Sequence, residues 1–108
     1  MWFRPEVRRI LAYSKPVDLR KSINGLVGVV KSVLEEDPLS GSVFVFFNRR
    51  GNYLKLVVWD RTGWCLVAKR LEHGRFRLPG DAPTQELSTQ VFQLLLDGIA
   101  LGPRAGAC

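Results

Sequence analysis

The period of the hydrophobic pattern changes near the middle of the chain, and this change constrains the fold more than any other feature. From Ser42 onward, apolar residues alternate with a period of two in the runs SVFVFFNR, YLKLVVWD, WCLVAKRLE and RFRLP. These runs are rich in valine and aromatic residues, which favour strands. RRGN, DRTG and HG separate them, and each is a credible tight turn. The pattern predicts an antiparallel β-meander of about four to five strands.

The turns also predict how these strands pair. Closing the three turns gives the opposed pairs Phe47 and Leu54, Val45 and Leu56, Val43 and Val58, Val58 and Cys65, Leu56 and Val67, and Leu71 and Phe76. All of these residues fall on one face, and a slip of one residue at any turn would destroy that agreement. We therefore expect this face to be a core face.

A helical stripe precedes the strands. Ile23, Leu26, Val27, Val30 and Leu34 recur at spacings of three and four residues, which predicts an amphipathic helix over residues 19–36. Asp18 is the expected N-cap, and the helix should stop before Asp37-Pro38 because a residue that precedes proline avoids the helical region. We expect this long helix to cover the core face of the meander.

Shorter elements flank these two regions. Residues 9–13 read as an edge strand or an extended lead-in, and residues 85–87 as an extended piece. Ser88 is placed to cap a short C-terminal helix that ends near Gly98. The chain has 108 residues, enough for one core. The prediction is a single α+β domain over residues 1–108, with flexible termini at residues 1–7 and 100–108.

The net charge of +6 comes from the central region of the chain. Lysine and arginine total 16 against 10 acids, and the surplus lies between Arg49 and Arg77, where the acids are Asp60 and Glu72. A basic surplus of this kind makes polyanion partners plausible. The bases proposed to contact nucleic acid are Arg49, Arg50, Lys55, Arg61, Lys69, Arg70, Arg75 and Arg77. Solvated surface charge is an equally good explanation of these residues.

The face opposite the expected core face mixes aromatic rings with cations. Tyr53, Trp59 and Trp64 lie there among the bases, an arrangement in which rings can stack on nucleotides while cations neutralise phosphates. The simpler interpretation for Phe44, Phe46 and Trp59 is burial beneath the C-terminal helix, whose leucines need a surface to cover.

Catalytic and metal-binding patterns are missing from the sequence. His73 precedes a glycine in an expected turn, and CxxC, HxxxH, HExxH and GxGxxG do not occur. We expect no enzyme activity, no metal, no cofactor and no small-molecule substrate, and a cryptic nuclease is a remote alternative. Cys65 and Cys108 are interpreted as reduced thiols of a cytoplasmic protein. Apolar windows of the length of a membrane span are absent, so membrane insertion is not expected.

An ordered series of motifs then suggests a family. PxDxRK from Pro16, FxFxNRR from Phe44, KxxxWD from Lys55 and KRLExGRF from Lys69 occur in this order, followed by LLLDGI from Leu94. The series resembles TnpB, the accessory protein encoded by the second open reading frame of bacterial transposable elements of insertion-sequence family sixty-six. The resemblance covers about residues 10–99, and it departs at Leu78-Pro79, where the family more often has tryptophan before the proline.

The resemblance implies a bacterial cytoplasmic protein that assists transposition, while a separate, larger transposase performs the chemistry. It supplies no functional residues, because the family has no agreed site. Combined with the charge pattern, it leads us to expect non-catalytic assistance through contact of the basic strands and hairpin tips with element DNA. The alternative is a protein adaptor whose cationic, aromatic face docks on the transposase.

Overall fold

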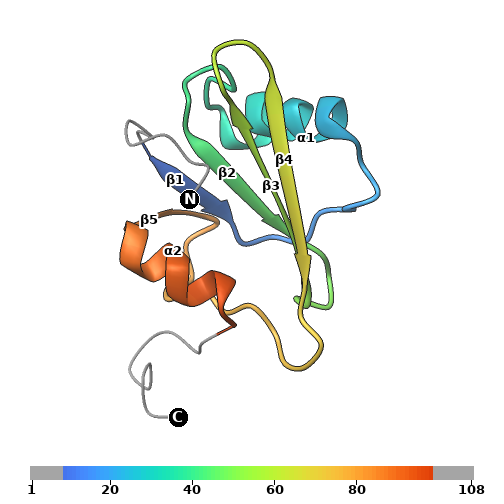
Figure 1. Ribbon diagram of the computed structural model, residues 1–108, viewed down its shortest axis with the longest axis vertical. Coiled ribbons are helices and arrows are strands. Elements are labelled where there is room, and N and C mark those ends of the chain that lie inside the picture. The colour runs from blue at the N-terminus through green and yellow to red at the C-terminus, as the bar shows by residue number, and fades with distance from the viewer. Residues whose placement is uncertain (1–8, 99–108) are drawn as a thin grey trace.

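A mixed sheet of five strands organises residues 9–98, the part of the chain that the computed structural model describes (Figure 1). The strands lie in the order β4-β3-β2-β1-β5. Their bounds are β1 (Ile10–Tyr13), β2 (Val43–Phe47), β3 (Tyr53–Trp59), β4 (Trp64–Arg70) and β5 (Thr84–Leu87). The termini expected to be flexible lie outside the described residues.

The central hairpins confirm the predicted register. β2 pairs antiparallel with β3 through Val43 and Val58, Val45 and Leu56, and Phe47 and Leu54. β3 pairs antiparallel with β4 through Leu56 and Val67, and Val58 and Cys65. The Asp60 N–H donates to the Gly63 carbonyl at 2.8 Å and closes the second turn as expected. Turn length and alternation together were sufficient to fix these pairs.

The sheet is not the pure meander that the pattern predicted. β1 pairs parallel with β2 and antiparallel with β5, so it lies inside the sheet and not at its edge. The buried side chains of Ile10, Leu11 and Ala12 explain this position, because a strand that is apolar on both faces needs cover on both. The β5 segment, predicted as an extended piece, forms the edge strand instead.

The run RFRLP is not a strand, which corrects the last hairpin of the prediction. The Phe76 N–H donates to the Gly51 carbonyl, and the Leu71 N–H to the Asn52 carbonyl, both at 2.8 Å. The chain after β4 therefore turns under the β2–β3 connection and inserts the Phe76 ring into the core, where it lies 6.0 Å from the Phe47 ring. Core insertion of this ring replaces the predicted pairing of Leu71 with Phe76.

The first helix is shorter than predicted. α1 (Ile23–Val29) continues into a π-helical turn, η1 (Val30–Leu34), and the two together span 12 residues. Its N-cap is Ser22 and not Asp18, whose carboxylate is engaged by Arg20. The helix ends at Glu35, which adopts the left-handed conformation at φ 55°.

The second helix follows the prediction. α2 (Thr89–Leu96) begins after Ser88, whose hydroxyl oxygen accepts a hydrogen bond from the Val91 N–H at 3.1 Å. Gly98 follows the helix with φ 75°, a conformation that suits glycine. Over the described residues, neither helix has the length and apolar character needed to cross a membrane.

Each helix covers one face of the sheet, and the long helix was predicted on the wrong one. Phe92 and Leu95 of α2 pack on the face that carries Val43, Val45 and Leu56. The buried stripe of α1 and η1, which is Leu26, Val30 and Leu34, packs on the opposite face, formed by Leu11, Phe44, Phe46 and Val57.

Chain topology explains the exchange of faces. α1 connects β1 to the neighbouring parallel strand β2, and crossovers of this kind are almost always right-handed. Handedness therefore decides which face α1 covers. The alternation of apolar residues along the strands does not contain that information.

Candidate nucleic-acid interface

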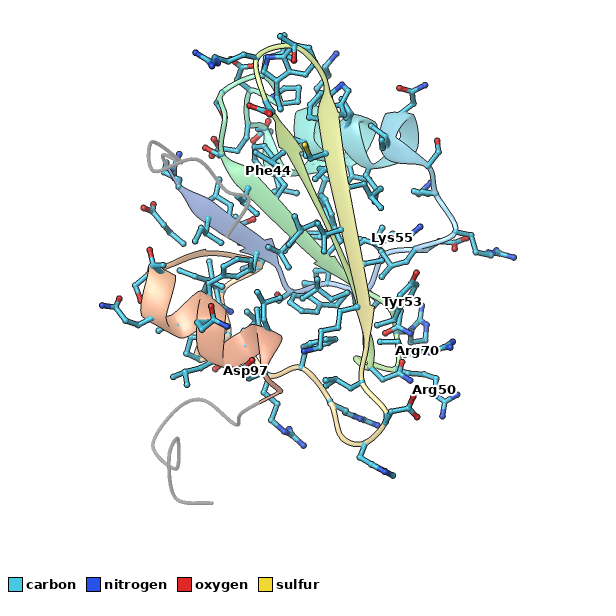
Figure 2. The ribbon with its side chains drawn as sticks, in the orientation of Figure 1. Phe44, Arg50, Tyr53, Lys55, Arg70 and Asp97 are labelled. Atoms are coloured by element: carbon cyan, nitrogen blue, oxygen red, sulfur yellow. The ribbon has the colours of Figure 1, made fainter. Side chains whose placement is uncertain are left out.

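Four of the predicted bases come together at one end of the sheet. Arg49 and Arg50 occupy the β2–β3 turn, and Arg70 ends β4 opposite Tyr53, the first residue of β3. The stem of Arg75 lies beside Gly51 of the same turn. Figure 2 shows Arg50 and Arg70 projecting at the same corner, close to Tyr53. We call Arg49, Arg50, Arg70 and Arg75 the basic corner.

The basic corner carries positive charge that nearby acids do not offset. Within residues 9–98 the ion pairs join Arg9 to Glu36, Arg9 to Glu86 and Arg20 to Asp18. In that same stretch, the four guanidinium groups of the corner have no carboxylate within 4.0 Å, and all four residues are exposed. Like charges held at one corner repel each other, and a bound anion relieves that repulsion.

Asn48 holds the turn that carries Arg49 and Arg50. Its Oδ1 accepts hydrogen bonds from the backbone N–H groups of Asn52 and Tyr53, each at 3.1 Å. Its Nδ2 donates to Oδ1 of Asn52 at 2.9 Å, and the backbone carbonyl of Asn48 accepts from the Gly51 N–H at 3.1 Å. The φ of 74° at Gly51 completes the reversal of the chain. The two arginines therefore project from a turn with its own hydrogen-bond network.

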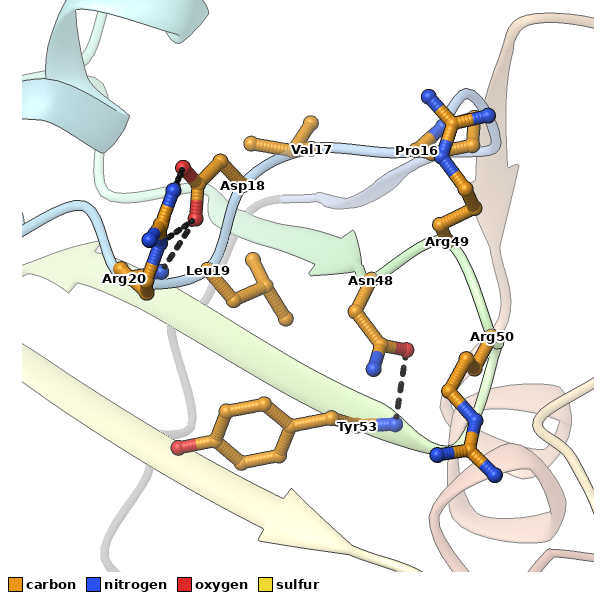
Figure 3. A pocket seen from close by; sticks show the side chains of 9 residues that line it. All are labelled: Pro16, Val17, Asp18, Leu19, Arg20, Asn48, Arg49, Arg50 and Tyr53. Carbon is orange, nitrogen blue, oxygen red and sulfur yellow. Dashed lines mark hydrogen bonds and ion pairs between the residues drawn. The ribbon is translucent and has the colours of Figure 1, made fainter.

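A cleft of about 440 Å³ opens beside the turn (Figure 3). Pro16, Val17, Leu19 and the Tyr53 ring supply its apolar lining. The remaining lining residues are polar or charged, namely Asp18, Arg20, Asn48, Arg49 and Arg50. The Val17 N–H donates to the Phe47 carbonyl at 2.9 Å and fixes the segment before α1 against the end of β2. The cleft thus combines an aromatic wall with guanidinium groups.

An ion pair lies at the border of the cleft. The Arg20 guanidinium donates to both carboxylate oxygens of Asp18, at 2.8 Å and 3.0 Å, and the Arg20 backbone N–H donates to the same carboxylate at 3.0 Å. These hydrogen bonds hold the pKa of Asp18 well below its usual range, and the carboxylate in turn raises the pKa of Arg20. Arg20 therefore neutralises Asp18, the acidic residue in the lining of the cleft.

The other predicted bases lie elsewhere. Arg61 occupies the β3–β4 turn at the opposite end of the sheet, and Arg77 is exposed in the loop that follows Arg75. Lys69 donates from Nζ to the Leu96 carbonyl at the end of α2. Lys55, half-buried on the α1 side, donates from Nζ to the Lys21 carbonyl at 3.4 Å. Lys55 and Lys69 therefore donate hydrogen bonds to backbone carbonyls of the protein.

The predicted aromatic residues also divide between the two ends of the sheet. Tyr53 lines the cleft, whereas Trp59 and Trp64 form an edge-to-face pair 5.2 Å apart at the far end. Phe44 and Phe46 are fully buried, but beneath α1 and not beneath the C-terminal helix, and Trp59 is half-buried. α1 thus covers much of the aromatic and cationic face, and Arg70 at the end of β4 is the corner residue that lies on its exposed part.

Sequence reasoning missed two contributors to this site. Asn48 was not predicted to hold the turn, although an asparagine next to a turn commonly accepts backbone hydrogen bonds. Leu19 and Arg20 were expected in the first turn of the helix, after an N-cap at Asp18, and no periodic signal indicates that this segment returns to the end of β2. The motif PxDxRK covers this segment but does not indicate where the segment packs.

Across residues 9–98 there is no group of three or more histidine, cysteine, aspartate or glutamate side chains that could hold a metal ion. Cys65 is a free, half-buried thiol on β4. His73 is exposed in the loop between β4 and β5.

Comparison with known proteins identifies the family. Residues 8–105 match the model of the IS66 Orf2-like proteins, so the chain belongs to this family of insertion-sequence accessory proteins. Two relatives from Sinorhizobium fredii (strain NBRC 101917 / NGR234) are the uncharacterized proteins y4jC and y4hO. The first is 39% identical over 95 residues, which cover 84% of this chain and 79% of y4jC. The second is 39% identical over 83 residues, which cover 76% of this chain and 72% of y4hO. No solved structure matches the chain.

Proposed function

We propose that this protein assists transposition of its element by binding DNA through the basic corner, without performing chemistry itself. The family supports the accessory role. The observation that carries the DNA contact is the convergence of four exposed arginines, none with a carboxylate within 4.0 Å in the described chain. The proposed place of action is the bacterial cytoplasm, beside the separate transposase.

Arginine is well suited to this contact. Its guanidinium forms paired hydrogen bonds to phosphate oxygens, and its planar group stacks on bases and aromatic rings. Arg49 and Arg50 project from a tight turn, a shape that can approach a nucleic-acid backbone, and the neighbouring Arg70 and Arg75 extend the positive surface. The neighbouring cleft offers the Tyr53 ring to an unpaired base, as in proteins that bind single strands.

The test is the salt dependence of DNA binding, measured by fluorescence anisotropy with duplex and single-stranded oligonucleotides from the element ends. The double variant Arg49→Gln/Arg50→Gln is compared with Lys31→Gln/Arg61→Gln, which removes the same charge from exposed residues outside the corner. Each phosphate contact contributes about 0.9 to the slope of log K against log salt on duplex DNA. We expect the first variant to reduce that slope by about 2 and the second to leave it nearly unchanged.

Two outcomes would overturn the proposal. If the wild-type protein binds neither duplex nor single-stranded DNA at low salt, the basic corner does not contact phosphates. If both double variants reduce the slope of log K against log salt equally, binding depends on net charge and not on the basic corner. If DNA binding is absent and the protein instead co-purifies with the transposase in a manner that Arg49→Gln/Arg50→Gln abolishes, the adaptor hypothesis replaces this one.

A further inference from the structure

Within residues 9–98, the outer edge of β4 has a row of backbone groups without strand partners. β4 is the terminal strand of the order β4-β3-β2-β1-β5 and spans seven residues, whereas the other edge, β5, spans four. Pro83, directly before β5, has no N–H to donate to a further strand. β4 contains no proline, and its charged residues are confined to its last two positions, Lys69 and Arg70. It therefore lacks most of the features that keep an edge strand from pairing.

Two hydrogen bonds identify which groups face outward. The Asp60 N–H donates to the Gly63 carbonyl, and the Leu71 N–H donates to the Asn52 carbonyl. Hydrogen-bonded pairs alternate in an antiparallel ladder, so between these two bonds the residues of β4 bonded to β3 are Cys65, Val67 and Lys69. The N–H and carbonyl groups of the alternate residues point away from β3. These outward residues are Trp64, Leu66, Ala68 and Arg70.

We propose that a second copy of this chain pairs antiparallel with this edge, about a two-fold axis at Val67. This register sets Trp64 opposite the partner's Arg70 and Leu66 opposite the partner's Ala68. It uses all four outward residues of each copy and forms eight backbone hydrogen bonds. Val67 faces its own counterpart in a pair without hydrogen bonds.

The charge pattern of β4 favours this register. Both cations lie at one end and Trp64 at the other, so antiparallel pairing sets Arg70 against an indole ring and Lys69 against Cys65. An arginine beside a tryptophan face gains a cation–π attraction and keeps its charge. A shift by four residues would oppose Lys69 to Lys69, and like charges directly across strands are destabilising. A shift by two residues leaves either Trp64 or Arg70, depending on its direction, without a partner in β4 and forms fewer hydrogen bonds.

The pairing would join the two sheets into one and place a basic corner near each end of the joined strands. Six residue steps separate Trp64 from Arg70, so the two Arg70 backbones would lie about 20 Å apart. This inference does not depend on DNA binding, because it follows from the edge of β4 alone.

The experiment measures the mass of the full chain by sedimentation equilibrium over a wide range of concentration. We expect a species of twice 12.2 kDa. Ala68→Pro should raise the dissociation constant about tenfold or more, since it removes two of the eight hydrogen bonds and spares the ladder to β3. Thr89→Pro is the matched control. It adds a proline at the first position of α2, where proline is tolerated, and should leave the dimer intact.

A disulfide variant tests the register and does not depend on how Ala68→Pro folds. In a Cys65→Ala/Cys108→Ser background, Val67→Cys should form a covalent dimer on mild oxidation, because Cα atoms of a pair without hydrogen bonds lie about 4.5 Å apart, within disulfide range. Ser32→Cys, exposed on the helix, is the control and should cross-link slowly. A wild-type mass of 12.2 kDa at every concentration would overturn the proposal. A dimer that neither Ala68→Pro weakens nor Val67→Cys cross-links would also overturn it, because that dimer would use another surface.

Discussion

Replacing Asn48 by alanine tests whether one side chain holds the turn of the basic corner. Asn48→Ala removes three hydrogen bonds of the side chain, two of them accepted from backbone N–H groups in a half-buried turn. Each such bond contributes about 0.5–1.5 kcal/mol net. The three bonds together contribute about 1.5–4.5 kcal/mol, and partial access of water to the freed N–H groups keeps the loss in the lower half of that range. We expect a loss of about 1.5–3 kcal/mol in the free energy of unfolding, measured by urea denaturation with an unchanged m-value.

Two variants separate the hydrogen bonds of the turn from loss of the side chain in general. Asn52→Ala removes the hydrogen bond that Nδ2 of Asn48 donates to the Asn52 side chain, and it keeps the two bonds that Asn48 accepts from backbone N–H groups. It should therefore be the milder change. Asn48→Asp keeps an oxygen that can accept from both backbone N–H groups and should retain much of the stability. If Asn48→Ala changes the free energy of unfolding by less than about 0.5 kcal/mol, or if Asn52→Ala is the more damaging variant, the turn does not depend on Asn48 as argued.

Three further predictions concern the fold. Phe44→Ala should destabilise by about 3–5 kcal/mol in thermal or urea unfolding, because the ring is fully buried beneath α1, and a much smaller loss would contradict that placement. Ser88→Ala should lower stability by about 1 kcal/mol through loss of the N-cap bond to Val91, and an unchanged melting temperature would count against the cap. Because Arg20 depresses the pKa of Asp18 below its ordinary 3.8, the pair stabilises the fold above that pH and the contribution is lost as the pH falls toward the folded-state pKa. The difference in melting temperature between wild type and Asp18→Asn should therefore shrink as the pH falls below 3.8, and a difference independent of pH would argue against the pair.

Local features of the fold could be predicted from the sequence. The pairing of Val45 with Leu56, and of Leu56 with Val67, follows from turn length and a period of two, both of which are local properties of the chain. The cap at Ser88 and the glycine at position 98 are local signals as well. In each case the residues that decide the structure are neighbours in the sequence.

The errors concern contacts between segments that are distant in the sequence. β1 pairs with β2 across the whole of α1, and no residue within Ile10–Tyr13 specifies whether the partner runs parallel or antiparallel. That one pairing decided which face α1 covers, and therefore which aromatic rings are buried. The same limit applies to the site. Arg70 was correctly expected on the face that carries Tyr53, whereas the return of Pro16 and Val17 to the end of β2 has no periodic signal.

The most direct test of DNA binding at the basic corner is a titration of the ¹⁵N-labelled protein with an oligonucleotide from the element end, followed by amide chemical-shift changes. We expect the largest changes in the turn from Asn48 to Tyr53, at Arg70 and at Arg75, and we expect them to weaken as salt is added. Changes centred on the Asp60–Gly63 turn or on the exposed side of α1, or a spectrum that DNA does not alter at low salt, would contradict this expectation.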